Sequence, residues 1–282
     1  RNCTYTRRNQ IMNIMKFGMK KTLKYAAAGM LCALYLAPAF AAEGKHDLLT
    51  VEAAENIRYS SQKITKAYFY KQQGVRPDRA TEDLKKSLAL LKKDLIVVQD
   101  GLKEGNKEEK NIVVYLEYTL DELLDLVDKP YSKENGALMI DYSESLLEGA
   151  EFVTEQHLHK ENREETMLVA VEELLFLLER INKFYIAYQA GFKDYNNVKQ
   201  LKKAVQDFES TLADINAYTK YADDTLTSRN KINEFWPVAK EFFVDIEKGA
   251  LPVIVLASVE KLENELKVLE DYHYKKASSN RK

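Results

Sequence analysis

Long stretches of this sequence repeat apolar residues every three or four positions with little glycine or proline between them. The clearest example spaces Leu84, Leu88, Leu91, Leu95 and Val98 by four, three, four and three residues, which places them on one stripe of a helix. The whole chain of 282 residues holds only ten Gly and five Pro. Strand-like alternation is nowhere sustained, so the sequence predicts an all-α fold of long helices joined by short turns.

The sequence also contains an internal repeat. A shift of 117 residues aligns residues 64–98 with residues 181–215 without a gap, and nine of these 35 positions are identical. Chance would give about two matches at a background of roughly one in sixteen, so a duplication is the simplest account. The identical pairs are Ile64/Ile181, Lys66/Lys183, Tyr68/Tyr185, Gln72/Gln189, Gly74/Gly191, Leu84/Leu201, Lys85/Lys202, Lys86/Lys203 and Leu95/Leu212.

Helix-stop signals divide each repeat into four predicted helices. In repeat 1, Gly74 with Pro77 beyond it ends the first helix, and Gly101 ends the second. Pro130 stops the third helix, and Ser132 is a candidate N-cap for the fourth. Repeat 2 follows the same plan, so we expect two tandem up-down four-helix bundles.

The repeats place the domain boundaries. We expect the first bundle at residues 42–160, the second at residues 161–276 and a tail at residues 277–282. No Pro or Gly lies between Gly149 and Gly191. The sequence therefore also allows the fourth helix of repeat 1 to run on into the first helix of repeat 2, which would set the bundles end to end on a shared helix.

The N-terminal region is typical of an export signal. Residues 15–24 are basic, residues 26–36 are apolar but short for a membrane span, and Ala39-Phe40-Ala41 fits a signal-peptidase site. We expect a cleavable signal peptide at residues 15–41, preceded by an upstream remnant at residues 1–14. The predicted location is the periplasm, and the alternative is an uncleaved N-terminal anchor in the inner membrane.

Charge and cysteine content exclude several function classes. Both cysteines, Cys3 and Cys32, lie in the segment that we expect to be removed, so disulfides and thiolate chemistry are not expected afterwards. Seven of the 42 Lys and Arg residues lie in residues 1–41, which leaves 35 basic residues against 44 acidic ones. This net charge of about -9 argues against a nucleic-acid partner.

One polar position on the first helix suggests ligand binding. Ser61 falls on the predicted core stripe, where repeat 2 has Leu178. A buried hydroxyl needs a hydrogen-bond partner, which is backbone, water or ligand. Arg58 and Gln62 flank Ser61, and a guanidinium with amide and hydroxyl donors suits a small oxyanion. In the alternative interpretation Ser61 bonds to the carbonyl one turn back and Arg58 is a solvated residue.

The same helix carries a resemblance to a known family. Residues 58–68, followed by Gly74-Val75-Arg76-Pro77 and the helix at residues 84–95, resemble the PilJ-type domain. This is the N-terminal domain of type IV pili methyl-accepting chemotaxis transducers, and it is similar to the periplasmic helical sensor domains of nitrate and nitrite receptors. The family motif residues kept here are Arg58, Ser61, Gln62, Lys63 and Lys66; the resemblance implies that they bind the ligand.

The resemblance covers residues 50–155 well and residues 165–275 more loosely. In the second copy Leu175 replaces the motif arginine, and Leu178-Glu179 replaces Ser-Gln, so that copy is degenerate. The family implies an exported periplasmic sensor-like module that binds a small molecule or oxyanion. No second apolar segment follows in the printed chain, so we expect it to modulate a membrane receptor or a pilus or chemotaxis component.

The sequence also allows a different function and a dimer. If the degenerate second copy marks a loss of ligand binding, the chain is an envelope scaffold or protein-interaction module rather than a ligand-binding module. A homodimer is compatible with either function, because related bundles often pair along their first helices.

Other candidate sites are weaker. His157 and His159, near Glu155 and Glu161, do not share one helix face, so we expect no metal site. The acidic residues are spread along the helices as solvated faces would be, and no set of residues typical of catalysis occurs. We expect no enzyme activity and no cofactor. The tyrosines Tyr68, Tyr70, Tyr185 and Tyr188 are expected to pack in the core rather than to stack on a ligand.

Overall fold

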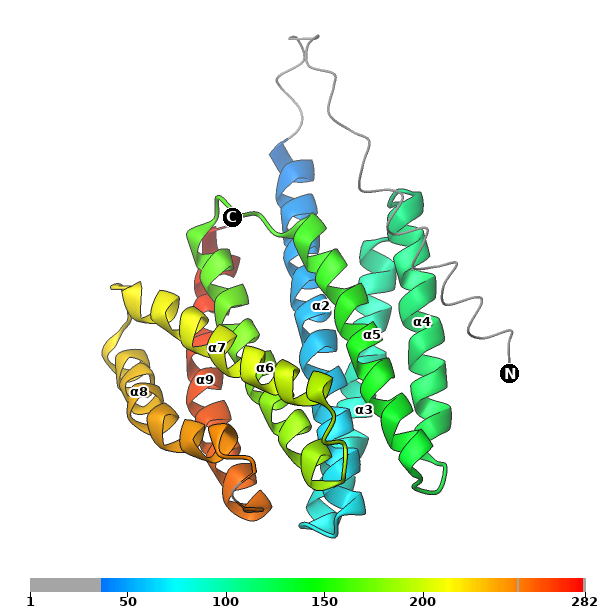
Figure 1. Cartoon of the computed structure of the whole chain (residues 1–282). Coiled ribbons are helices and arrows are strands. Elements are labelled where there is room, and N and C mark those ends of the chain that lie inside the picture. The colour runs from blue at the N-terminus through cyan, green and yellow to red at the C-terminus, as the bar shows by residue number, and fades with distance from the viewer. Residues whose placement is uncertain (1–36, 248, 281–282) are drawn as a thin grey trace.

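The computed structural model describes residues 37–247 and 249–280, which form eight helices and no strand (Figure 1). The all-α prediction is therefore confirmed for this part of the chain. The helices are α2 (Ala37–Gln72), α3 (Pro77–Gly101), α4 (Lys107–Val127), α5 (Lys133–His157), α6 (Arg163–Gln189), α7 (Tyr195–Ala217), α8 (Asp223–Val244) and α9 (Pro252–Asn280).

The helices form two rings of contacts that lie side by side. In the first ring α2 contacts α3 and α5, and α4 contacts α3 and α5. In the second ring α6 contacts α7 and α9, and α8 contacts α7 and α9. The rings join where α2 packs against α6, so the first helices of the two repeats meet at the centre of the molecule (Figure 1).

The helices end at the helix-stop residues that the sequence predicts. Gly74 has a φ of 66°, which a residue with a side chain rarely adopts, and α2 ends two residues before it. Pro77 occupies the first turn of α3, where its missing N–H costs nothing. The Ser132 side chain accepts a hydrogen bond from the Asn135 backbone N–H at the start of α5, which confirms the predicted N-cap.

The continuous helix that the sequence allows across the two repeats does not form. Helix α5 ends at His157, and α6 begins at Arg163 after a short connection. The Asn162 side chain accepts hydrogen bonds from the backbone N–H groups of Glu164 and Glu165, so it starts a new helix without help from Gly or Pro. The chain can therefore turn back, and the second ring packs beside the first instead of beyond it.

Helix α2 begins at Ala37 and so includes the predicted cleavage site at residues 39–41. The rest of the predicted signal peptide, the upstream remnant at residues 1–14, and both Cys3 and Cys32 lie outside the described residues. From Ala37 onward, with residue 248 and the last two residues left aside, no helix has the length and apolar character needed to cross a bilayer.

An aromatic stack joins α7 and α8 in the core of repeat 2. The rings of Phe208 and Trp236 lie 3.9 Å apart between centroids and 24° from parallel. Phe208 is fully buried and Trp236 is 4% exposed. Trp236 also lies near Phe243, with 6.2 Å between ring centroids. Such large buried rings contribute much of the apolar surface that folding removes from water.

We therefore predict that Trp236→Ala lowers the free energy of unfolding by about 3–5 kcal/mol, since it leaves a cavity against Phe208. Urea denaturation followed by circular dichroism measures the change. Tyr195→Ala is the matched control, because Tyr195 is 78% exposed and its removal should change stability by less than about 0.5 kcal/mol. Equal effects of the two substitutions would show that the stack is not part of the core.

Candidate functional site

The five motif side chains of α2 lie on the contact between the two repeats or beside it. Contacts join Arg58 to Glu173, Lys66 to Glu179 and Tyr70 to Asn182, so residue numbers rise together and the two helices run parallel. Helix α2 is covered by α3, α5 and α6. Most of its polar residues are therefore buried, and a buried polar group needs a partner inside the protein.

Arg58 is held by two carboxylates. Its Nη1 donates to Glu55 at 2.6 Å, and its Nη2 donates to Glu173 of α6 at 2.5 Å. The guanidinium also lies 4.5 Å above the centre of the Phe176 ring. Burial alone would lower the Arg58 pKa, but Glu55 and Glu173 raise it above its usual value, so this cation is firmly charged. Arg58 is 6% exposed and is not a solvated residue.

Ser61 and Gln62 are engaged with backbone and with each other. The Ser61 hydroxyl donates to the Arg58 carbonyl at 2.7 Å, as the alternative interpretation of the sequence predicted. The Gln62 amide donates to Ser61 Oγ at 3.0 Å and to the Ser143 carbonyl of α5 at 3.3 Å. Ser61 thus has its partner without a ligand.

Lys63 and Lys66 bind carboxylates of repeat 2. Lys63 Nζ donates to Glu263 of α9 at 2.7 Å and to the Tyr59 hydroxyl at 2.5 Å. Lys66 Nζ lies 2.7 Å from Glu179 Oε2 of α6, and both of these side chains are almost fully buried. Burial raises the pKa of Glu179, and Lys66 and Lys63 oppose that rise. These ion pairs tie the first helix of repeat 1 to two helices of repeat 2.

Repeat 2 makes the equivalent connection in the other direction, because Arg180 and Lys183 on its first helix bind a carboxylate of repeat 1. Arg180 donates to both carboxylate oxygens of Glu144 on α5, at 2.7 and 2.6 Å. Lys183 donates to Glu144 at 2.5 Å and to Ser143 Oγ at 3.0 Å. Burial would raise the Glu144 pKa, but Lys183 and Arg180 hold it below its usual range. Burial lowers the pKa of Lys183 to about 8, against the pull of Glu144.

The two connections are related by the sequence repeat. A shift of 117 residues takes Lys63 to Arg180. Lys63 binds Glu263 on the fourth helix of repeat 2, and Arg180 binds Glu144 on the fourth helix of repeat 1. Each first helix therefore binds the fourth helix of the other repeat. We call these ion pairs, together with Lys183–Glu144 and with Lys66–Glu179 between the two first helices, the crossed ion pairs.

The carboxylates of the crossed ion pairs are the residues that sequence reasoning missed. The sequence predicts that acidic residues such as Glu144, Glu179 and Glu263 lie on solvated helix faces, but Glu179 is fully buried. The available signal was position: Glu179 aligns with the motif residue Gln62 and lies inside an apolar stretch of α6. A charged residue on a core stripe indicates a buried partner of opposite charge.

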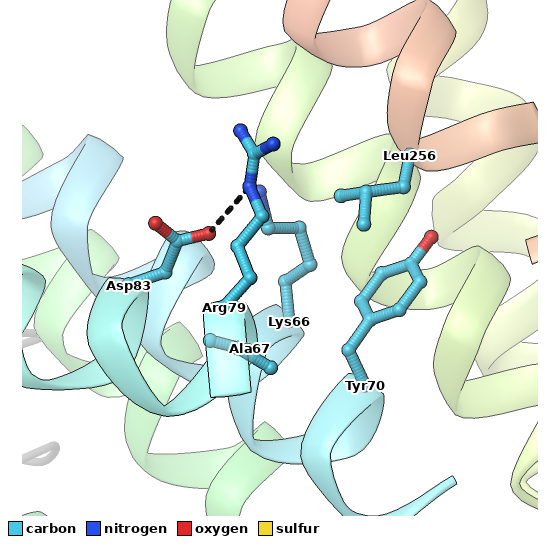
Figure 2. A pocket seen from close by; sticks show the side chains of 7 residues that line it. Lys66, Ala67, Tyr70, Arg79, Asp83 and Leu256 are labelled. Carbon is cyan, nitrogen blue, oxygen red and sulfur yellow. Dashed lines mark ion pairs between the residues drawn. The ribbon is translucent and has the colours of Figure 1, made fainter. Parts of the chain in front are cut away.

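A small pocket lies beside Lys66, between α2, α3 and α9 (Figure 2). Its volume is about 10 Å³, which is room for one water molecule. Figure 2 shows the Tyr70 and Leu256 side chains on one side of it and Arg79 with Asp83 on the other. Arg79 also pairs with Glu260 at 2.8 Å. Nitrate or a larger ligand would fit here only after the helices move apart.

The remaining candidate residues, the histidines, the tyrosines and a lysine–serine contact, are engaged in contacts within the fold. His157 Nε2 lies 3.1 Å from Glu109, and in the described parts of the chain no three His, Cys, Asp or Glu residues are grouped as a metal site. Tyr68, Tyr70 and Tyr185 are each about 1% exposed and pack in the core as predicted, whereas Tyr188 is only partly buried against it. Lys183 and Ser143 form a lysine–serine contact, but both are fully buried and a substrate has no access to them.

Comparisons of the chain with family models, with curated proteins and with solved structures give no match.

We predict that Lys66→Met destabilises the protein by about 3–5 kcal/mol, because it removes the nearer cation of the buried Glu179 and leaves only Lys63, whose Nζ lies 3.9 Å away. The double variant Lys66→Met with Glu179→Leu should cost less than Lys66→Met alone, since both charges are then gone. Urea denaturation measures both values. Lys86→Met is the control, because the exposed Lys86–Glu82 pair should contribute less than about 1 kcal/mol. A double variant no more stable than the single one would contradict the buried ion pair.

Proposed function

We propose that this chain is an exported module of the bacterial cell envelope that acts by binding a protein partner through its surface. The basic and apolar segments at residues 15–36 and the Ala39-Phe40-Ala41 sequence support export to the periplasm. The resemblance to the PilJ-type domain supports an envelope setting, with a membrane receptor or a pilus or chemotaxis component as the partner.

One observation favours a protein partner over a small-molecule ligand. The five side chains that would bind an oxyanion face internal partners, and the three cations among them are matched by Glu55, Glu173, Glu179 and Glu263. An anion entering this interface would have to displace a carboxylate from a buried cation. That exchange is unfavourable, because the displaced carboxylate would stay buried without its partner.

The outer surface offers apolar side chains for such a partner. Val114 on α4 is 60% exposed and Val238 on α8 is 62% exposed, so each repeat presents an accessible apolar residue. Isolated residues of this kind are ordinary on protein surfaces, and they serve here as positions from which a partner can be detected.

A small-molecule sensor is the second candidate, and buried polar atoms without a partner favour it. Gln62 Oε1, Ser60 Oγ and Asn182 Nδ2 are buried close to the α2–α6 contact and have no hydrogen-bond partner among the described residues. A ligand or ordered water in this region would satisfy them.

A ligand panel separates the two candidates. We predict that nitrate, nitrite, other small anions and amino acids leave the thermal unfolding midpoint of the purified protein unchanged. Ligands that bind only the folded state raise this midpoint by mass action. A rise of several degrees that Ser61→Ala abolishes would contradict the proposal and establish the sensor, whereas Ser61→Ala should otherwise behave like the unchanged protein toward the whole panel.

Photo-crosslinking in cells tests the partner directly. A crosslinking amino acid at Val114 or Val238 should give a discrete adduct with one envelope protein in at least one case. The same amino acid at Lys86, an exposed charged position on α3, is the control for random collisions. Adducts no different from those of the control, together with a positive ligand panel, would overturn the proposed function.

A further inference from the structure

A second group of charged residues lies at or beside the α2–α6 contact, on the N-terminal side of the crossed ion pairs along both helices. These side chains act on one another electrostatically across five helices. We call them the interface acid cluster, and they are Glu52, Glu55 and Arg58 on α2, Lys93 and Asp94 on α3, Glu151 on α5, Glu172 and Glu173 on α6, and Lys267 and Glu270 on α9. Seven of these groups are carboxylic acids and three are bases.

The cluster is built around a pair of equivalent residues. A shift of 117 residues takes Glu55 to Glu172, so the two repeats bring the same acidic side chain to their shared interface. Glu55 is 2% exposed and accepts hydrogen bonds from Arg58 and Thr154. Glu172 is 6% exposed, and its Oε2 has no hydrogen-bond partner among the described residues.

The acids of the cluster outnumber its bases by four. Glu151 and Lys93 are exposed, but Glu55, Asp94 and Glu172 are buried, and a buried unpaired charge costs several kcal/mol. Glu172 has the least compensation, because Glu55, Glu270 and Glu52 all act on it as like charges and only Lys267 opposes them. A proton on Glu172 removes the repulsion and supplies a donor at the site where a hydrogen bond is missing.

The pKa directions agree with this geometry. Burial raises the pKa of Glu172 well above its usual range, and Glu55, Glu270 and Glu52 raise it further. Burial likewise raises the pKa of Asp94 to about 7, with Lys93 opposing and Glu52 adding to the rise. The Glu52 pKa is also raised, first by burial and then by Glu270.

We propose that the interface acid cluster is a pH-sensitive switch in the contact between the two repeats. It holds protons while α2 and α6 are packed together, and it weakens that contact when the pH rises and the protons leave. The switch is a property of the fold, and it operates whichever partner the surface binds.

The direction of the pH effect follows from linkage. A carboxyl group whose pKa is higher in the folded than in the unfolded protein stabilises the fold fully below its unfolded pKa, near 4.5 for Glu172. This stabilisation is lost as the pH rises through the folded pKa. Asp94 adds a contribution that is lost between its ordinary pKa of 3.8 and about 7. Both groups therefore make the protein less stable in mildly alkaline than in mildly acidic solution.

The test compares Glu172→Gln with the unchanged protein in urea denaturation from pH 5 to pH 9. The amide mimics a protonated carboxyl, so the folding equilibrium constant of the variant relative to the unchanged protein should rise by up to about tenfold for each pH unit until Glu172 itself ionises. Glu155→Gln, at an exposed position on α5, should follow the unchanged protein at every pH. A constant ratio for Glu172→Gln would overturn the proposal.

A second measurement reads the ionisation of Glu172 directly in the unchanged protein and uses variants only to assign the signal. Carbon-13 NMR of the glutamate side-chain carboxyls, with the Glu172 signal identified by its absence in Glu172→Gln or in Glu172→Asp, reports the folded pKa. Titration of that signal above neutral pH supports the switch. Titration near 4.5 shows that Glu172 is charged at neutral pH, which would also overturn the proposal.

Discussion

The structure depends on keeping buried cations of α2 and α6 next to carboxylates from the opposite repeat. Lys66 and Lys183 are almost fully buried, and each would be intolerable in the interior without its carboxylate. Their partners, Glu179 and Glu144, come from helices of the other repeat. The two repeats therefore cannot separate without exposing or stranding these charges, and the crossed ion pairs fix which helices meet and in which register.

This arrangement gives the sequence duplication a structural meaning. Equivalent first helices pack in parallel, and each binds the fourth helix of the other repeat, so the chain resembles a dimer whose halves are joined covalently. The face of α2 that a separate bundle would offer to a ligand or to another subunit is used for this internal contact. Our proposal of a function at the outer surface follows from that use of α2, and the interface acid cluster places a pH-dependent element in the same contact.

Much of the fold could be predicted from the sequence because helix periodicity and helix ends are local properties. The Leu84 to Val98 stripe, the stop at Gly74 and the N-cap at Ser132 depend on neighbours in the chain. The break before α6 was missed because Asn162 ends the continuity without Gly or Pro. At the site, the Ser61 bond to a carbonyl three residues back was among the predicted alternatives, since it too is local.

The ion pairs could not be predicted, because they join residues far apart in the sequence. Lys66 and Glu179 are separated by 113 positions, and the apolar stretch around Glu179 indicates that it is buried without identifying its partner. The motif lysines were read as ligand residues and the glutamates as solvent-exposed, whereas the structure shows them to be each other's partners. These residues pair with each other because α3, α5 and α6 bury α2 on three sides. That burial is a property of the tertiary packing and not of the local sequence.

Native-state hydrogen exchange tests the central claim, that α2 and α6 unite the two repeats into one cooperative unit. The slowest-exchanging amides of Arg58–Tyr70 and of Leu174–Tyr185 should share one opening free energy, equal to that of global unfolding, and should respond identically to added urea. If instead the amides of α6–α9 open together at a lower free energy while α2–α5 stay protected, the repeats are independent domains and the account is contradicted.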